Sequence, residues 1–211
     1  MTRATAYQQF RDRLLSGELQ PGQFVTQKEL AQLAGVPIGT AREAIQKLEH
    51  EALLKVHPQR GIQVADVTTK FIREAFGLRE ALEVQGVRNF ASGDFGIEID
   101  MLLAATRDVL EDARANPTAD TLERAVEVDW DMHDRIIGSL NNDLLNETYQ
   151  INATRLRLIK VSNRFSPDRA LTALAEHLDI LELCKAQEAE GAAKALSHHI
   201  HTAMTRALQG Q

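Results

Sequence analysis

Residues 26–48, TQKELAQLAGVPIGTAREAIQKL, predict two short helices joined by a tight turn. Thr26 with Glu29 three residues later is the pattern of a capping box, which starts a helix. This helix ends near Gly35, and a second one opens after Pro37 and extends to about residue 52. The second helix has one apolar face at helical spacing, formed by Ala41, Ala44, Ile45 and Leu48. Such a pair predicts a helix-turn-helix.

The sequence on either side of this pair completes a small domain. Apolar side chains at helical spacing predict a first helix over residues 4–16. A short strand is predicted at residues 23–25, and a β-hairpin follows with strands at 53–57 and 62–65. Three helices followed by a hairpin are typical of a winged helix-turn-helix, which we assign to residues 1–66.

The charge is divided unevenly along the chain. The 211 residues carry 24 Lys and Arg against 30 Asp and Glu, a formal net charge of −6. Residues 1–65 hold eight basic and six acidic side chains, a net +2, so the remainder of the chain carries −8. This asymmetry is what a DNA-binding head attached to an acidic body would give.

Basic side chains stand at the positions of the head that would meet DNA. Lys28 opens the second helix, Arg42 lies near the start of the third, and Arg60 lies at the hairpin tip. In a winged helix-turn-helix these positions face phosphate, the major groove and the minor groove respectively. A short three-helix piece could instead be a protein-interaction module, but the basic residues favour double-stranded DNA as the partner.

The composition excludes several classes of protein. A single cysteine, Cys184, excludes an intrachain disulfide framework and fits a reducing cytoplasm. No apolar run is long enough to cross a bilayer, and residues 1–7 lack the apolar core of a signal peptide. We therefore expect a cytoplasmic protein with no membrane partner.

The chain beyond residue 66 shows only helical periodicity. Six helices are predicted near residues 69–92, 96–115, 118–139, 142–163, 167–187 and 190–208. Ser166 before Pro167 is a strong signal for the start of a helix. The expected fold class is therefore mostly α, with a winged helix-turn-helix followed by an all-α bundle of six or seven helices over residues 67–211.

Four side chains with metal-ligand chemistry fall on the inward faces of these helices. They are Asp129, His133, His177 and His199. His198 and His201 fall instead on a polar outer face. Each buried histidine alone is best interpreted as a hydrogen-bonded core residue, but a carboxylate and three imidazoles from three helices favour a bound ion. An Asp-His₃ set suits a divalent metal, zinc first with nickel, iron or manganese as alternatives, and leaves positions for water or a ligand.

Two arginines are candidates for binding a small molecule. Arg79 lies on the inward stripe of the helix at 69–92, where it either forms an intrahelical pair with Glu83 or extends into the metal cavity to bind a ligand carboxylate. Arg155, with Asn152 one turn earlier, is a second candidate for binding an effector. An exposed, salt-bridged arginine is an equal alternative for Arg155.

Short fragments over essentially the whole chain resemble one known family. In the head they include Glu29-Leu30-Ala31, Gly35-Val36, Arg42-Glu43-Ala44-Ile45 and Leu48-Glu49. In the body they are Arg79…Leu82-Glu83, Asp129…His133, Glu176-His177…Ile180 and His199. Each fragment is weakly specific, but their order and spacing together resemble the GntR regulators of the FadR type, in the subgroup whose C-terminal domain is called FCD.

The resemblance implies a homodimer that binds a pseudo-palindromic operator and senses a small carboxylate. It implies that Asp129, His133, His177 and His199 hold the metal, and that the effector completes the metal shell and contacts Arg79. Lys28 and Arg42 match DNA contacts of the family. The usual Ser-Arg-Thr-Pro is replaced by PIGT at residues 37–40, so that Ile38 stands where an arginine often reads bases. Ile38 would contact a thymine methyl instead, and Thr40 is included among the DNA-binding residues.

The mechanism expected from these features is repression relieved by ligand. Effector binding would change how the helices of the body pack and hence the spacing of the two heads on DNA. A metal-dependent hydrolase is the main alternative, because Asp-His₃ can activate water. It is disfavoured because no additional general base lies beside the ligands, with Asp131 and Asp134 off the inward stripe. A metal-free structural helical bundle is the third interpretation.

Overall fold

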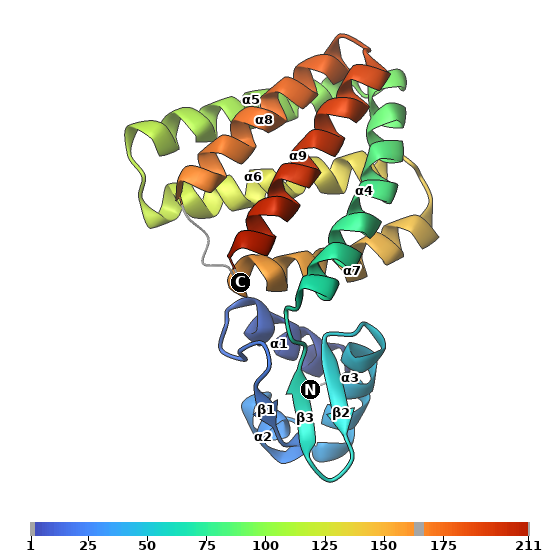
Figure 1. Ribbon diagram of the computed structural model, residues 1–211, viewed down its shortest axis with the longest axis vertical. Helices are drawn as coiled ribbons and strands as arrows, with labels where there is room; N and C mark the ends of the chain where they lie inside the picture. Colours follow the sequence, from blue (N-terminus) through green and yellow to red (C-terminus); the bar gives the residue numbers. More distant parts are fainter. Residues whose placement is uncertain (1–2, 163–166, 211) are drawn as a thin grey trace. The chain divides into compact units, whose positions relative to one another are not determined.

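The computed structural model describes residues 3–162 and 167–210, which divide into two compact units (Figure 1). The first unit contains the chain up to residue 73 and the second half of α7 (Asp143–Ser162), from residue 151. The second contains residues 74–150 and the chain from α8 (Pro167–Lys185) to residue 210. Because α4 (Thr69–Ser92) and α7 are both divided between the two units, the domain boundary expected at residue 66 stays a prediction.

The first unit, which we call the head, combines helices with a small antiparallel sheet. Its helices are α1 (Arg3–Leu15), α2 (Gln27–Leu33) and α3 (Ile38–His50). Its strands are β1 (Phe24–Val25), β2 (Leu54–His57) and β3 (Gly61–Val64). The sheet has the order β1-β3-β2. The winged helix-turn-helix predicted from the sequence is confirmed.

The turn between α2 and α3 has the local structure that the sequence predicts. The hydroxyl of Thr26 accepts a hydrogen bond from the Glu29 amide at 3.1 Å, and the Glu29 carboxylate accepts one from the Thr26 amide at 2.6 Å. The capping box is therefore present, and it satisfies two amides at the start of α2. Gly35 ends the helix with φ of +60°, a conformation that glycine adopts without steric cost.

The hairpin has a third strand that the sequence did not connect to it. Residues 23–25 were predicted as an isolated strand, whereas β1 pairs with β3 through Val25 opposite Ile62. Both of these side chains are buried in the head core. Gly61 has φ of +97°, and a Cβ there would lie 2.9 Å from the carbonyl oxygen of Val25. Close approach of β1 to the hairpin therefore requires glycine at this position.

The second half of α7 belongs to the core of the head. Leu158 is fully buried within the same apolar cluster as residues of α1 and α3. Arg155 Nε donates a hydrogen bond of 2.9 Å to the carbonyl of Glu51, the residue that ends α3. The Tyr7 hydroxyl donates to the Glu51 carboxylate at 2.8 Å. Burial and this carboxylate raise the pKa of Tyr7 to about 12, so the hydroxyl keeps its proton and α1 and α7 both fix the end of α3.

The second unit is purely helical among its described residues. Besides α8 and the first half of α7, its helices are α4 (Thr69–Ser92, from residue 74), α5 (Gly96–Ala115), α6 (Ala119–Gly138) and α9 (Ala189–Gln209). The six predicted helices match these bounds to within two residues at each end. The cap expected at Ser166 lies outside the described residues. Helix α8 packs against α5, α6 and α9, which places it at the centre of the bundle (Figure 1).

Helix α4 approaches α6 closely at Gly86. A Cβ at this position would lie 2.8 Å from the carbonyl oxygen of Ile136 and 2.9 Å from its Cγ2 atom. Ser139 adds a hydrogen bond across the same contact, from its hydroxyl to the Gly86 carbonyl. The two helices can meet at this distance only because residue 86 has no side chain.

Substitution of Gly86 by alanine is expected to lower the free energy of unfolding by about 1–3 kcal/mol, because the added methyl group overpacks the contact with Ile136. Gly77 on the same helix is the matched control, since no described atom lies within 4 Å of a Cβ placed there. Gly77→Ala should stabilise the protein by up to about 1 kcal/mol through helix propensity alone. Urea unfolding of both variants measures the difference, and equal stabilities would contradict the close approach.

Candidate functional site

The predicted DNA-binding residues lie on exposed parts of the head. Lys28 near the start of α2, Arg42 in the first half of α3 and Arg60 at the hairpin tip are all exposed. Ile38, at the start of α3, has 52% of its surface exposed, and Thr40 is half-buried. The opposite face of α3 is buried in the head core.

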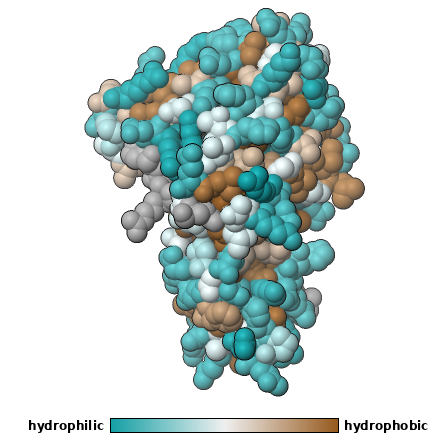
Figure 2. Space-filling view, in the orientation of Figure 1, coloured by the Kyte–Doolittle hydropathy of each residue, from teal (hydrophilic) through white to brown (hydrophobic). Residues whose placement is uncertain are grey.

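This arrangement leaves the outer face of α3 exposed and places a basic side chain at the tip of the hairpin. The visible surface of the head is mostly hydrophilic with a few apolar spots (Figure 2). Exposed Gln46 lies one turn after Arg42 on the same face of α3, and its amide can bond to base edges or phosphate. The sequence reasoning did not single out Gln46, although its position four residues after Arg42 indicates the same exposed face.

Three of the predicted metal ligands come together inside the second unit. His133 on α6, His177 on α8 and His199 on α9 have 0%, 0% and 4% of their surfaces exposed. One nitrogen from each lies within 4.8 Å of the others, and the Nε2 atoms of His177 and His199 are 3.3 Å apart. The inward positions predicted for these three histidines are therefore observed.

Carboxylate oxygens lie next to the Nδ1 atoms of two of the three imidazoles. His199 Nδ1 lies 2.6 Å from Glu176, and His133 Nδ1 lies 2.9 Å from Oε2 of Glu83. A histidine whose Nδ1 proton is directed to a carboxylate presents the lone pair of Nε2 on the other side of the ring. His199 therefore presents its Nε2 lone pair toward the cluster, whereas the contact between His133 Nδ1 and Glu83 is close but lacks hydrogen-bond geometry.

Asp129 lies beside this cluster and not at its centre. Its Oδ1 atom is 3.7 Å from Nε2 of His177, and its side chain is 17% exposed. The sequence placed it on the same stripe as His133, but in the structure it is nearer the surface than the histidines. Its oxygen is close enough to His177 for Asp129 to serve as a further ligand at the edge of the cluster.

Arg79 pairs with Glu83 and also extends to the histidine cluster, which were the two alternatives considered for it. Its Nε donates to Glu83 Oε1 at 2.9 Å, and its Nη2 lies 2.5 Å from Nε2 of His133. Burial opposes ionisation of both partners, but their attraction outweighs it, raising the pKa of Arg79 and lowering that of Glu83. A charged pair is thus buried directly against the histidine cluster, with its guanidinium facing the imidazoles.

The imidazoles of His177 and His199 are held neutral by their surroundings. Burial lowers the pKa of His177 well below its ordinary value of 6.5, and the neighbouring His199 and His133 act in the same direction. Burial also lowers the pKa of His199, although Glu176 opposes the shift. Neutral imidazoles are the form that binds metal ions.

The residues present fit a divalent ion of the zinc type. Three imidazole nitrogens, one of them on a ring held by a carboxylate hydrogen bond, and one carboxylate at the edge, are the usual donors for zinc, nickel, iron or manganese. His177 Nδ1 is a buried polar atom with no hydrogen-bond partner among the described residues. A cluster that is costly to bury as it stands would be stabilised by an ion.

Stability of the chelator-treated protein is expected to fall as the pH is lowered from about 7.5 to about 5.5. In the unfolded chain these histidines bind protons below a pKa of about 6.5, whereas in the folded protein the buried His177 and His199 stay unprotonated at the same pH. Each histidine therefore lowers the free energy of unfolding by up to about 1.4 kcal/mol for each pH unit below this pKa. Urea unfolding measures this loss. The His177→Ala variant should lose part of the pH dependence and His198→Ala should keep it; a flat profile in the unmodified protein would contradict the burial of neutral imidazoles.

Arg155 and Asn152 do not lie in this second unit. Both belong to the half of α7 that is part of the head, where Asn152 is fully buried and Arg155 donates to the Glu51 carbonyl. Their predicted contact with an effector stays a prediction.

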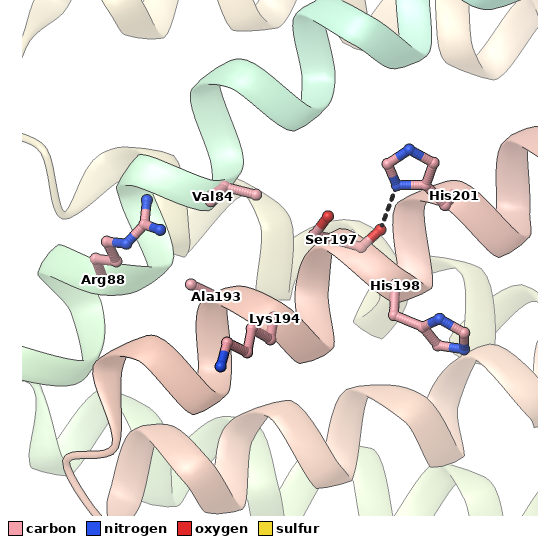
Figure 3. A pocket seen from close by; sticks show the side chains of 7 residues that line it. All are labelled: Val84, Arg88, Ala193, Lys194, Ser197, His198 and His201. Atoms are coloured by element: carbon pink, nitrogen blue, oxygen red, sulfur yellow. Dashed lines mark hydrogen bonds between the residues drawn. The ribbon is translucent and has the colours of Figure 1, made fainter.

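His198 and His201 lie on the outer face of α9, as predicted. They line a groove of about 450 Å³ between α4 and α9, together with Arg88 and Lys194 (Figure 3). The figure shows His201 bonded to the backbone of its own helix, and Arg88 binds Glu190 through two hydrogen bonds. Neither histidine is grouped with His133, His177 and His199 as a potential metal ligand.

Glu176 and Glu83 are the site residues whose roles the sequence reasoning missed. Glu176 was noted only as part of a motif and Glu83 only as a partner for Arg79. Each acts on a histidine of a different helix, so no spacing along the chain indicates the pairing. A carboxylate directly before His177 was the available signal, but it is His199 that Glu176 binds.

Comparison with known proteins places this architecture in a family. The pattern of the FCD domain matches residues 74–202, and that of the bacterial regulatory proteins of the gntR family matches residues 2–64. The chain belongs to the GntR family and carries an FCD domain. It is therefore a transcriptional regulator with a DNA-binding head and an effector-binding body.

Curated relatives of this GntR regulator extend over most of its length. An HTH-type transcriptional regulator of Bacillus subtilis, YdhC, is 26% identical over 196 residues, which cover 92% of this chain and 86% of the relative. The HTH-type transcriptional repressor RspR of Escherichia coli is 25% identical over 182 residues, covering 85% and 77%. The matched families and relatives are regulators of transcription and not enzymes, which decides against the hydrolase alternative.

Solved structures share the fold of the regulator. A transcriptional regulator GntR from Rhodococcus sp. RHA1 has a TM-score of 0.78 at 20% identity, covering 98% of this chain and 97% of that one. McbR/YncC of Escherichia coli has a TM-score of 0.74 at 21% identity over the same shares. The Zn²⁺-bound FCD domain of TM0439 has a TM-score of 0.51 at 23% identity, covering 69% of this chain and 96% of that domain. Within the described residues of this regulator, no helix combines the length and apolarity needed to span a bilayer.

Proposed function

We propose that this regulator is a cytoplasmic, homodimeric repressor of the FadR subfamily, released from its operator by a small carboxylate that binds beside a divalent metal. The observation that carries the proposal is the buried cluster of three imidazoles against which the charged Arg79 is placed. The cluster combines a site for a cation with a group that recognises an anion, inside a unit that is separate from the DNA-binding head.

The metal is proposed to be zinc, held by His133, His177 and His199 with Asp129 at the edge. The carboxylates of Glu83 and Glu176 would orient two of the imidazoles. Zinc bound in an FCD domain of the same fold, that of TM0439, supports the choice. Bound there, the metal would supply a Lewis-acidic position for a ligand oxygen.

The effector is proposed to be a small molecule with at least one carboxylate. A guanidinium binds a carboxylate through two parallel hydrogen bonds, and burial strengthens such bonds. Arg79 uses one donor for Glu83 and one for His133, which leaves three of its five N–H groups for a ligand. Arg155 and Asn152 remain further candidates for effector contacts.

The DNA target is proposed to be a pseudo-palindrome read by two heads. Two copies related by a twofold axis place their recognition helices about one turn of DNA apart. Arg42, Ile38 and Thr40 would face the major groove, Lys28 a phosphate and Arg60 the minor groove. The relative RspR, which is a repressor, supports a negative effect on transcription.

The test measures whether a carboxylate lowers the affinity of the protein for its operator. Fragmented genomic DNA captured by the purified protein and sequenced identifies the operator, and fluorescence anisotropy of that duplex measures affinity with Zn²⁺ present. Succinate, malate and citrate are then titrated as carboxylate probes beside a neutral polyol. Release by a carboxylate is the expected result. Operator binding that no carboxylate weakens in the presence of Zn²⁺, or that citrate and polyol weaken equally, would contradict the proposed sensing.

A further inference from the structure

Arg79 holds the nitrogen of His133 that a metal ion would require. Nδ1 of this histidine lies 2.9 Å from the Glu83 carboxylate, in a contact that lacks hydrogen-bond geometry. Because a guanidinium can only donate, its contact with Nε2 requires the proton of the neutral ring to be on Nδ1. The remaining lone pair is on Nε2, and Arg79 Nη2 lies 2.5 Å from it. A neutral imidazole has a single nitrogen lone pair of this kind, which can accept a hydrogen bond or bind a metal but not both.

We propose that Arg79 competes with the metal ion for His133, and that the effector carboxylate relieves this competition by accepting the guanidinium. The inference rests on the proposed function and adds a regulatory role for one residue. It makes the affinity for metal depend on the presence of a ligand for Arg79.

Two contacts hold the guanidinium of Arg79 in place. Arg79 and Glu83 lie one turn apart on α4, and their side chains are 8% and 0% exposed. The Nε bond to Glu83 therefore holds the arginine next to His133, and because the guanidinium is planar and rigid, Nη2 can leave His133 only if the side-chain torsions of Arg79 change. Binding a dication at Nε2 would force that end to move, both because the lone pair is taken and because the two positive charges repel.

An effector carboxylate can accept a hydrogen bond from the displaced Nη2 group of Arg79. Once Nη2 leaves His133, a donor in a buried site has no acceptor, which is unfavourable. A ligand carboxylate satisfies it and cancels part of the positive charge. Metal and effector should therefore bind with positive coupling, and the coupling must be the same whichever is added first.

The experiment measures the affinity of the full-length protein for Zn²⁺ alone, by competition with a chromophoric chelator. Arg79→Met removes both the competing donor and the charge, so Zn²⁺ should bind about tenfold tighter or more than in the unmodified protein. Arg79→Lys keeps the positive charge beside Glu83, but replaces the planar guanidinium, whose Nε and Nη2 donate in two fixed directions, by one ammonium nitrogen. It should likewise bind Zn²⁺ more tightly, by a smaller factor. Arg88→Met is the matched control on α4, where the arginine binds the exposed Glu190, and should leave the affinity unchanged.

The outcomes separate this inference from the proposed metal centre. Unchanged or weaker Zn²⁺ binding in both Arg79 variants, with binding that still requires His199, overturns the competition alone. Tighter binding in Arg79→Met with unchanged binding in Arg79→Lys shows that only charge matters, and also overturns it. Zn²⁺ binding that is absent or independent of His199 in the unmodified protein contradicts the metal centre itself. Arg79→Lys decides the question if Arg79→Met fails to fold.

Discussion

Replacement of His199 by alanine is expected to lower the affinity of the regulator for Zn²⁺ by at least about a hundredfold. Substituting a residue that only supports a ligand already costs about tenfold to a hundredfold, and His199 would be a ligand itself. Its Nε2 atom lies 3.3 Å from that of His177, and its Nδ1 is held by Glu176. Removal of the imidazole leaves two nitrogens and an edge carboxylate. Chelator competition measures the affinity directly.

His198→Ala is the matched control for His199→Ala. His198 is on the same helix, is exposed and lines the outer groove, so His198→Ala changes the same side chain without touching the cluster. It should bind Zn²⁺ as the unmodified protein does. Thermal stability gives an independent measure, because saturating Zn²⁺ raises the melting temperature of a protein that binds it only when folded. An equal effect of Zn²⁺ on both variants would show that the ion binds elsewhere.

Local signals explain why the helices could be predicted closely. The capping box of Thr26 and Glu29 and the glycine at residue 35 determine the ends of α2 by interactions with adjacent residues. The breaks between the later helices contain proline, glycine or asparagine, which act on their own backbone in the same way. Contacts between distant segments are different. The pairing of β1 with β3 and the inclusion of Leu158 of α7 in the head core depend on packing that no local spacing indicates.

The same distinction applies to the candidate site. Helical periodicity placed His133, His177 and His199 on buried faces because each face is defined by its own helix. It also indicated the pair of Arg79 with Glu83 one turn later on the same helix. It could not show that Glu176 of α8 would bind His199 of α9, or that Arg79 of α4 would contact a histidine of α6. Asp129 was placed on the right stripe, but periodicity does not say how far along a helix the core extends.

Replacement of Arg42 by alanine is expected to weaken operator binding about tenfold for each head, and therefore about a hundredfold for a dimer on a palindrome. A good contact between an arginine and a guanine contributes about 1–3 kcal/mol of discrimination, and both half-sites lose it together. Arg42 is exposed on the first half of α3, opposite the buried residues Ala41, Ala44 and Ile45. Fluorescence anisotropy with the identified operator, repeated at several salt concentrations, measures the loss.

Arg107→Ala is the control that distinguishes an effect of the position of Arg42 on α3 from an effect of losing one positive charge. Arg107 is exposed on α5 in the second unit and binds Glu182, so its removal makes the same change in net charge without altering the head. If Arg42 reads bases, its loss should reduce operator binding while binding to unrelated DNA changes little. If it meets phosphate, both should weaken and the salt dependence should fall by about one counterion per head. Equal losses of operator affinity in Arg42→Ala and Arg107→Ala would instead mean that the overall charge of the protein governs binding. They would contradict a direct contact between α3 and the DNA.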